Sequence, residues 1–528
     1  MRHYLRDVRM PNFKKPNYNQ DTMVVINFEE QIRPGTFEFV LHKLIEERLD
    51  LTPFYERYHN DHGGRSAYDP AILLKITLFG YYHGIRSSRD IEWACKTNIM
   101  FKALSCDTQP HFTSIASFIS SQPDAIADIF TQILLVCDQE GLIGHELIAI
   151  DGCKISSNAA KEHSGTFEEL AQKRDKIQRQ IRACVKEHQK LDRRRTGERE
   201  RKDQLEQSIE TLNNHFNKID QFLKTETPRM GQGKRKKEVK SNITDNESAK
   251  MTTSKGTIQG YNGVAAVDKK HQIIVDAQAF GEGQEHHTLQ PVIEQIQARY
   301  STIGLDVGLV EDQIIITADT GFANEANYAY LKDNAFNAYV PDNSFRLRDP
   351  KFKHQKVKHG KRHQDTVKGI KKVIPASEFT LNKRDKTCVC PEGNPMWLKH
   401  ETTDQYGKCK LSFEGKLTDC RHCPRKNECM RHPGSADTRE GHGRQVTFTI
   451  DTRNSPTAWM QKRVDSRYGK QVYQHRMSVV EPVFANIGTQ KGLDRFGLRG
   501  KKKVQGQWQL YCLVHNIEKL ANYSAMGC

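Results

Sequence analysis

The sequence lacks any apolar run long enough to cross a membrane. Its best apolar window, residues 71–85, is interrupted by Lys75, whereas a membrane-spanning helix needs about 20 consecutive apolar residues. The first residues, Met1 to Asp7, are polar and charged, so the apolar core of a secretory signal is missing there as well. These absences predict a cytoplasmic protein with no membrane partner.

Acidic residues are few relative to basic ones. The 528 residues include 81 Lys and Arg but only 65 Asp and Glu, which gives a net charge of +16. Because phosphates attract Lys and Arg whatever the base sequence, this balance favours a nucleic-acid partner. A basic protein that is merely well solvated is the alternative interpretation. The length allows several domains and a sizeable core.

Cysteine is not scarce, but it is unevenly distributed, since six of the 13 cysteines lie within residues 388–429. In a chain without an export signal, such crowding indicates metal binding more than disulfides. Cys420-x-x-Cys423 is a zinc half-site, and Cys390 opens a knuckle-like turn that supplies the other half. The expected ligands of a structural zinc ion are Cys390, Cys420, Cys423 and Cys429, with Cys388 as the substitute. Reduced cysteines without a metal are the alternative.

Helical periodicity dominates the first part of the chain. Residues 1–33 are polar and predict an irregular arm, whereas residues 34–140 carry apolar side chains at helical spacing. Asp69 and Pro70 are an N-cap and an N1 proline within that region. We expect an α-helical domain at 34–140, whose role is either DNA binding or dimerisation and packing.

Two polar segments interrupt the region that follows. An apolar stripe among the charges of residues 166–226 predicts an inserted helical hairpin that turns at 193–197. Residues 228–257 then form a basic linker, for which a solvated charge run and a DNA contact are the two interpretations.

Two acids follow short apolar runs. Residues 146–150 lead into Asp151 and Gly152, and the β-branched run at 313–318 leads into Asp319, with Gly321 two residues later. Both runs are too short for buried helices and predict strands covered on both faces, each of which ends at its acid. The glycines let another group approach the backbone closely.

The order of elements predicts the fold class. A hairpin at 260–278, helices at 288–300 and 324–333 and a strand at 337–341 surround these two runs. This order predicts an α/β fold in which helices pack on a mixed sheet, the RNase H-like arrangement, with its first part at 141–341. We expect a basic and cysteine-rich insertion at 342–450, with short strands at 387–389, 410–413 and 445–450, and the last part of the core at 451–528.

A third acid is expected from a helix beside the sheet. Glu481 adjoins Val480 and Val483, which would pack on the sheet. A lone acid at the edge of a buried face has a solvation cost unless something charged uses it. A helix-start glutamate favoured by Pro482 and the helix dipole is the alternative.

Glu285, His286 and His287 form another polar cluster, just after the predicted hairpin. In isolation they are candidate metal ligands or proton shuttles, but a polar helix start is the preferred interpretation. The preferred metal site is therefore formed by Asp151, Asp319 and Glu481, because Mg²⁺ takes oxygen ligands and two-metal phosphoryl transfer uses bridging carboxylates.

These residues lie in motifs that resemble the DDE transposases of bacterial insertion sequences. The motifs are AIDG around Asp151, TADTGF around Asp319 and YQHRMSVVEPVF around Glu481, together with the segments at 68–95, 258–268 and 496–520. The resemblance implies that the three acids bind two Mg²⁺ (or Mn²⁺) ions, cut the ends of an element and join them to target DNA. It also implies a homodimer acting on double-stranded DNA at the nucleoid, and phosphate contacts from Tyr473 and Arg476.

The chain departs from the commonest signature of that family, which places Arg four residues before the Glu and Lys seven after it. Arg476 is five residues before Glu481, and Gly488 occupies the lysine position. Lys491 is the expected replacement. Two alternatives to a transposase remain: a nuclease that uses the same acids without strand transfer, and a transposase-derived DNA-binding protein that no longer catalyses.

Overall fold

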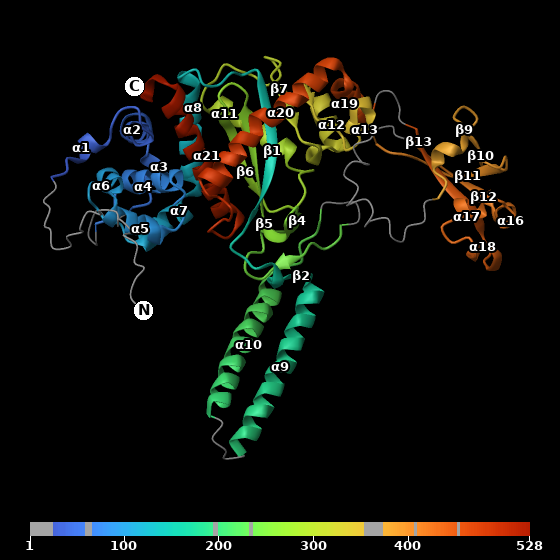
Figure 1. The fold of residues 1–528 in the computed structure, drawn as a ribbon, viewed down its shortest axis with the longest axis horizontal. Coiled ribbons are helices and arrows are strands. Elements are labelled where there is room, and N and C mark those ends of the chain that lie inside the picture. Colours follow the sequence, from blue (N-terminus) through green and yellow to red (C-terminus); the bar gives the residue numbers. More distant parts are fainter. Residues whose placement is uncertain are drawn as a thin grey trace, which may run out of the picture.

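The computed structural model describes residues 25–58, 66–193, 199–231, 236–352, 373–405, 409–450 and 455–527. Figure 1 shows a body of sheet and helices, a two-helix hairpin that projects from it, and a small sheet at one side. Most of the predicted N-terminal arm, nearly all of the predicted turn at 193–197 and most of the basic stretch at 351–372 lie outside the described residues.

A six-stranded mixed sheet organises the body. Its strands are β1 (Leu147–Ser156), β4 (Ala249–Thr253), β5 (Gly256–Asp268), β6 (Ile274–Phe280), β7 (Ile315–Ala318) and β8 (Ala338–Tyr339). β1 lies between β5, which is antiparallel to it, and β7, which is parallel to it. β8 continues the parallel side, and β4 and β6 both pair with β5. The predicted RNase H-like mixed sheet is confirmed.

The strand that carries Asp151 is longer than predicted. The prediction that it ends at Asp151 is wrong, because antiparallel pairing with β5 continues to Ser156. The parallel partner stops earlier, where Ile150 pairs with Ala318. Asp151 therefore lies one residue beyond the last pair with β7, at the same level as Asp319.

Part of the predicted basic linker belongs to the sheet. β4 pairs with the start of β5, and a two-residue strand, β3 (Ser241–Asn242), pairs with β2 (Ser164–Gly165). The alternation of buried and exposed side chains in β4 is only five residues long, so the surrounding lysines masked it in the sequence.

Helices cover the sheet and fill the N-terminal region. The N-terminal helices are α1 (Phe28–Gln31), α2 (Phe37–Lys43), α3 (Thr52–Tyr55), α4 (Pro70–Tyr82), α5 (Ser88–Thr97), α6 (Ile99–Leu104), α7 (Phe112–Ser121) and α8 (Pro123–Gln139). The later helices of the body are α11 (Leu289–Thr302), α12 (Glu325–Asp333), α13 (Phe345–Arg348), α19 (Pro456–Asp465), α20 (Arg467–Ala485) and α21 (Lys501–Tyr523). In the part of the chain that the structure describes, no helix meets the length and apolarity needed to span a bilayer.

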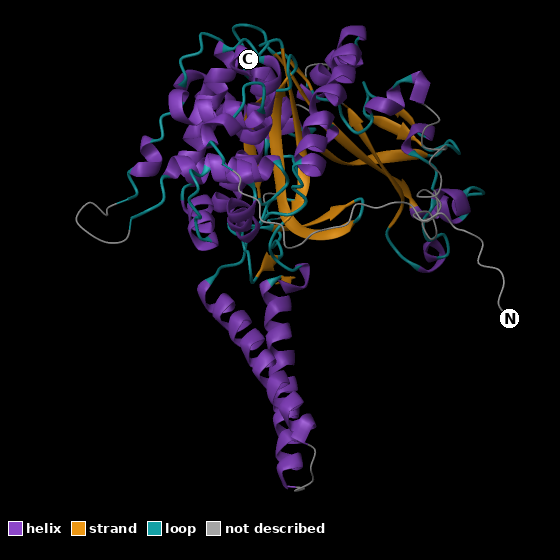
Figure 2. Ribbon diagram, turned by 60° about the vertical axis from the view of Figure 1, so that its left-hand side comes forward, coloured by secondary structure: helices purple, strands orange, loops and turns teal. Residues whose placement is uncertain are grey.

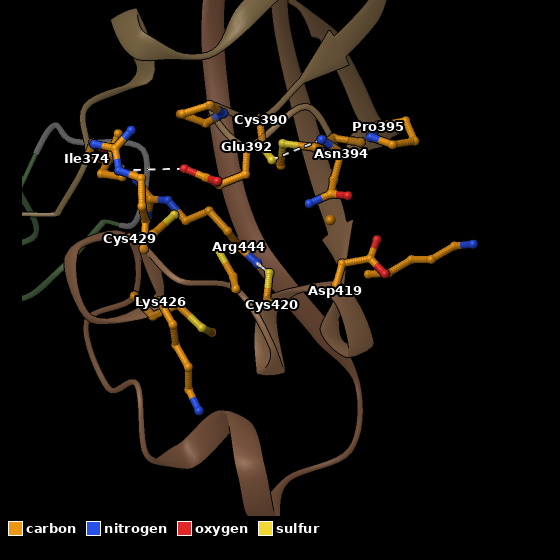
Figure 3. A pocket seen from close by; sticks show the side chains of 17 residues that line it. Ile374, Cys390, Glu392, Asn394, Pro395, Asp419, Cys420, Lys426, Cys429 and Arg444 are labelled. Atoms are coloured by element: carbon orange, nitrogen blue, oxygen red, sulfur yellow. Dashed lines mark hydrogen bonds and ion pairs between the residues drawn. The ribbon is translucent and has the colours of Figure 1, made fainter.

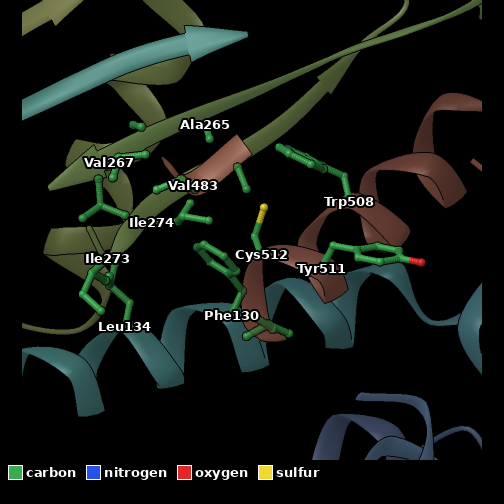
Figure 4. Packing of buried hydrophobic residues seen from close by; sticks show 14 of the residues in the cluster. Phe130, Leu134, Ala265, Val267, Ile273, Ile274, Val483, Trp508, Tyr511 and Cys512 are labelled. Carbon is green, nitrogen blue, oxygen red and sulfur yellow. The ribbon is translucent and has the colours of Figure 1, made fainter. Parts of the chain in front are cut away.

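The C-terminal helix α21 joins the N-terminal helices to the sheet. Nearly every side chain from Val504 to Ile517 is buried, which is typical of a helix enclosed in a core. Tyr511 stacks on Tyr81 of α4 with 4.3 Å between ring centroids. Figure 4 shows the other side of the helix, where side chains of α8, α20 and α21 meet those of β5 and β6. The N-terminal helices thus share one hydrophobic core with the sheet.

The helical hairpin consists of α9 (Phe167–Arg193) and α10 (Arg199–Thr225), which lie side by side and project from the body (Figure 2). Their buried apolar contacts gather near the base, around Leu170, Ile177, Ile219 and Phe222.

The cysteine-rich region forms a small lobe with a sheet of its own. Its strands are β9 (Thr380–Asn382), β10 (Thr387–Val389), β11 (Pro395–Thr403), β12 (Cys409–Lys416) and β13 (His442–Ile450), and its helices are α16 (Leu417–Arg421), α17 (Lys426–Cys429) and α18 (Ser435–Thr438). β10, β12 and β13 cover the three strands predicted there, whereas β9 and β11 were missed. The lobe has a separate small hydrophobic cluster around Phe413 and Leu411.

Candidate active site

Asp151 and Asp319 lie side by side where two parallel strands part. Asp151 is in β1 with 19% of its side chain exposed, and Asp319 directly follows β7 with 37% exposed. Burial raises the pKa of the Asp151 carboxyl, the Arg476 guanidinium opposes this rise, and the charge of Asp319 adds to it. Two carboxylates so placed favour a cation between them.

That cation is supplied by helix α20. Arg476 Nη1 lies 2.6 Å from Asp151 Oδ2, and its Nη2 lies 3.5 Å from Asp319 Oδ1. One turn earlier, the Tyr473 hydroxyl donates a hydrogen bond of 3.3 Å to Asp319 Oδ1. The two residues expected to contact phosphate therefore lie at the two strand-end acids, and the Arg476 guanidinium bridges them.

Glu481 lies on a different face of the same helix. Its side chain is exposed, whereas Arg476, Val480 and Val483 are buried. A five-residue offset corresponds to about 140° around an α-helix, so the rotation that brings Arg476 to the aspartates turns Glu481 towards solvent. The structure does not gather the three predicted acids at one point.

Lys491 is also placed away from the aspartates. It is 3% exposed, its Nζ lies 3.0 Å from Glu518 Oε1, and the same atom lies 4.0 Å from the centroid of the Tyr82 ring. Burial lowers the pKa of Lys491, and Glu518 opposes that change. These contacts are those of a residue that joins α21 to the N-terminal helices.

Glu285, which the sequence analysis considered as a metal ligand but assigned to a polar helix start, lies close to the two aspartates. It lies in the connection between β6 and α11. Burial raises the pKa of Glu285, an Asn262 hydrogen bond opposes this, and the charges of Asp151 and Asp319 raise it further. A signal existed in the sequence: the glycines after the two aspartates indicated a close approach, and the group that approaches is this carboxylate.

The donor atoms at this site fit a hard divalent cation. Asn262 is fully buried, its Nδ2 donates to Glu285 Oε1 at 3.1 Å, and its Oδ1 has no hydrogen-bond partner. Carboxylate and amide oxygens are the ligands that Mg²⁺ and Mn²⁺ prefer. Among the described residues, however, no three His, Cys, Asp or Glu side chains are close enough to hold a metal as they stand, and Arg476 occupies the space between the two aspartates.

A second candidate metal site lies in the small lobe. A cavity of about 40 Å³ is lined by Cys390, Cys420, Cys423 and Cys429 (Figure 3). Burial raises the pKa of Cys429, and the thiols of Cys420, Cys423 and Cys390 add to the rise, so all four lie within electrostatic reach of one another. Four thiols are the ligand type of a tetrahedral zinc ion, although among the described residues no three of them are close enough to hold a metal as they stand.

The turn that carries Cys390 resembles that of a zinc knuckle, whereas Cys420 receives an N–H from strand β13. Cys390 Sγ accepts from the Asn394 backbone N–H at 3.3 Å, and Cys420 Sγ accepts from the Arg444 N–H at 3.4 Å. Gly393 adopts a φ of +80° between Cys390 and Asn394, which favours glycine. Such N–H donors stabilise a thiolate sulfur.

Cys388 belongs to the lobe's hydrophobic core. Its side chain is 1% exposed, and its Sγ lies 4.0 Å from the Met396 sulfur. It does not line the cavity. Strand alternation would place Cys388 on the same face as Cys390, but β10 ends at Val389. Cys390 lies in the turn that follows, so Cys390 lines the cavity and Cys388 does not.

Two segments of the chain match models of protein families. Residues 26–121 match the transposase domain DUF772, and residues 389–521 match a transposase DDE domain. The second match begins in β10 and runs through α20 into α21, so it includes the four cavity cysteines, Tyr473 and Arg476. Asp151, Glu285 and Asp319 lie between the two matches. Among curated proteins, no relative matches the chain.

Proposed function

Since the chain is a DDE transposase of the insertion-sequence type, with its two matched domains in the expected order, we propose that it cuts the ends of a DNA element and joins them to target DNA. DNA is the partner that this family implies. The proposal assigns the chemistry to the strand-end acids Asp151 and Asp319 and to Arg476 and Tyr473 of α20.

The observation that carries this proposal is the bridge from Arg476 to both aspartates. Asp151 and Asp319 come from strands outside the matched DDE segment, whereas Arg476 comes from inside it. Packing of α20 on the sheet therefore brings residues that are far apart in sequence to one point. An acidic centre with an arginine above it has the charges needed to bind a phosphodiester beside a divalent cation.

The acids and the arginine have separate roles in this proposal. Mg²⁺ or Mn²⁺ ions held by the acids would activate water and stabilise the leaving oxygen. Arg476 would then donate the hydrogen bonds of its two N–H groups to oxygens of the scissile phosphate instead of to the aspartates. The phosphate oxygens match the planar guanidinium. Tyr473 would donate its hydroxyl hydrogen bond to the same phosphate.

The small lobe has a structural role in the proposal. A zinc ion bound by Cys390, Cys420, Cys423 and Cys429 would stabilise a segment whose own hydrophobic cluster is small. Four thiolate ligands leave no open position for catalysis.

A strand-transfer assay with the full chain tests the proposed function. The substrate is a linear DNA that ends in the element's terminal repeat, supplied intact or pre-cut with a free 3′-hydroxyl, together with a supercoiled target and Mg²⁺. We expect cleaved and joined products, and a loss of at least about 100-fold in both for Asp151→Asn and Asp319→Asn, the scale of removing a charge-stabilising group from an active site.

The control is Glu294→Gln, which changes an exposed acid on α11 and should retain wild-type rates. Cleavage without joined products would instead identify a nuclease. Specific binding of the terminal repeat without either reaction would identify a non-catalytic DNA-binding protein. A dimer bound to two paired ends is expected, because both ends must be joined together, and analytical ultracentrifugation of the complex measures it.

A further inference from the structure

The two glycines that follow the strand-end acids have a neighbour in common. A Cβ atom at Gly152 would lie 2.8 Å from Glu285 Oε1, and a Cβ atom at Gly321 would overlap Glu285 Oε2. The Glu285 carboxylate therefore lies in the space between these two glycines. Side chains at either position would exclude it from the neighbourhood of Asp151 and Asp319.

The segment that carries Glu285 is held in place by the segment that follows Asp319. The side-chain amides of Asn324 and Asn327 both donate to the His286 carbonyl, at 2.6 and 3.0 Å. Asn327 Nδ2 also donates to the Phe322 carbonyl at 2.7 Å. The position of Glu285 is thus determined by the loop that contains the second aspartate.

Nothing in these contacts accounts for a negative charge at this place. Thr288, not Glu285, occupies the N-cap position of α11. The side chain of Glu285 is near two other acids and receives its hydrogen bond from a neutral amide, and the charge of Lys154 offsets the repulsion of the acids only in part. A partly buried carboxylate beside like charges destabilises the fold unless a cation is bound there.

A second observation at the same place also indicates a missing cation. Asn262 is 0% exposed, and its amide lies against Gly152 beside the Glu285 carboxylate. With Nδ2 bonded to Glu285, its Oδ1 is a buried acceptor without a partner. Exchanging the nitrogen and oxygen of the Asn262 amide would place Oδ1 next to a Glu285 oxygen, and two acceptors repel each other. The orientation with Nδ2 towards Glu285 is therefore the favourable one. An orphaned amide oxygen beside the Glu285 carboxylate is one of the hard oxygen donors that a Mg²⁺ site uses.

We propose that Glu285 is a further carboxylate ligand of the divalent-metal centre that Asp151 and Asp319 would form. The inference rests on the proposed function, because it presumes that those two acids bind metal. Glu285 reaches the centre from the connection before α11, whereas Glu481 lies on the exposed face of α20.

Metal-directed cleavage of the chain tests this placement without any catalytic turnover. Fe²⁺ replaces Mg²⁺ at such sites, and with ascorbate and hydrogen peroxide it cuts the backbone near its ligands. We expect fragments cut near residues 151, 285 and 319, and their suppression by excess Mg²⁺. Cuts near 151, 319 and 481 with none near 285 would overturn the proposal.

Titration of Mn²⁺ binding in the full chain gives a second readout, either by electron paramagnetic resonance or by calorimetry. Glu285→Gln should weaken Mn²⁺ binding at least 10-fold, and the matched variant Glu294→Gln on α11 should not change it. Glu285→Gln keeps the hydrogen bond from Asn262 and removes one of three like charges, so its melting temperature should not fall. Unchanged Mn²⁺ affinity in a folded Glu285→Gln variant would contradict the assignment.

The strand-transfer assay separates failure of this inference from failure of the proposed function. Loss of joining in Asp151→Asn, Asp319→Asn and Glu285→Gln agrees with both. Loss in the two aspartate variants alone, with wild-type joining by Glu285→Gln, overturns only the role of Glu285. Wild-type joining by the aspartate variants overturns the proposed function itself.

Discussion

Arg476 Nη1 lies 2.6 Å from Asp151 Oδ2, and both side chains are mostly buried, with 8% and 19% of their surface exposed. The Nε atom of the same guanidinium is buried without a hydrogen-bond partner. This contact neutralises an acid that a metal would otherwise neutralise. Under the proposed function, Arg476 both stabilises the protein without metal and competes with the metal for Asp151.

Replacement of Arg476 should therefore separate stability from metal affinity. Arg476→Ala leaves Asp151 buried and unpaired, so we expect unfolding free energy to fall by about 2–4 kcal/mol. Mn²⁺ affinity should rise several-fold while strand cleavage falls. Urea denaturation and Mn²⁺ titration measure these effects. Arg467→Ala, at an exposed position of the same helix, should change stability by less than about 0.5 kcal/mol. Weaker Mn²⁺ binding by Arg476→Ala would argue against competition.

Gly152→Ala should disturb the site more than the fold. The added Cβ would lie 2.8 Å from Glu285 Oε1 and 2.9 Å from Asn262 Oδ1. The end of the Glu285 side chain can move, so we expect a stability loss of about 1 kcal/mol, within the range of ordinary substitutions, but a fall of at least 10-fold in strand cleavage. Gly304→Ala, at a position with no atom within 4 Å of the added Cβ but a φ of +66°, controls for backbone strain alone. Equal activity losses in the two variants would contradict the prediction.

His515 should make stability depend on pH. Burial lowers the pKa of His515 from 6.5 to about 4, and the ring bonds the Gln272 carbonyl at 2.9 Å. As the pH falls, the His515 ring is protonated in the unfolded chain before it is protonated in the folded protein. The contribution of His515 to stability is therefore fully present above pH 6.5 and is lost as the pH falls towards 4. The shift corresponds to about 3 kcal/mol at most.

Urea denaturation between pH 4.5 and 7.5 measures this dependence. His515→Gln, which has no titrating ring, should reduce the slope, whereas His475→Gln at an exposed position should leave it unchanged. Parallel pH profiles for wild type and His515→Gln would show that other groups cause the acid sensitivity.

The small lobe should contain one zinc ion per chain. Mass spectrometry of the metal content measures it, and Cys423→Ser should lose the ion because it removes one of four thiols at the cavity. Substitution with Co²⁺ should give the thiolate charge-transfer bands of a tetrahedral site. Cys106→Ser, at an exposed cysteine, should retain the metal. Protein that takes up neither Zn²⁺ nor Co²⁺ at equimolar concentration would exclude this site.

Lys491 should act on stability and not on the salt dependence of DNA binding. Lys491→Ala removes the ion pair of Glu518, which is 17% exposed and keeps only its hydrogen bond from Asn486, so we expect a loss of about 2–3 kcal/mol. The slope of log affinity against log salt should stay within experimental error, because no phosphate contact is removed. Lys503→Ala at an exposed position controls for net charge. A reduced slope specific to Lys491→Ala would restore its expected role as a DNA contact.

The sequence alone determined the features that depend on local pattern. Short apolar runs that end near Asp151 and Asp319 predicted two strands of a mixed sheet, which the structure places side by side. The spacing of Cys420 and Cys423 predicted a zinc half-site, and both residues line one cavity. Such features follow from periodicity and chain direction, which neighbouring residues already contain.

Tertiary structure decided which side chains meet. The rotation of α20 is set by packing of Val480 and Val483 on the sheet, and this rotation brings in Arg476 and turns Glu481 outward. The polar cluster at 285–287 could not be told from a helix start by its local pattern. Its position depends on hydrogen bonds from Asn324 and Asn327, about 40 residues away in the chain. Contacts between distant segments depend on the whole packed core, so no short stretch of sequence contains them.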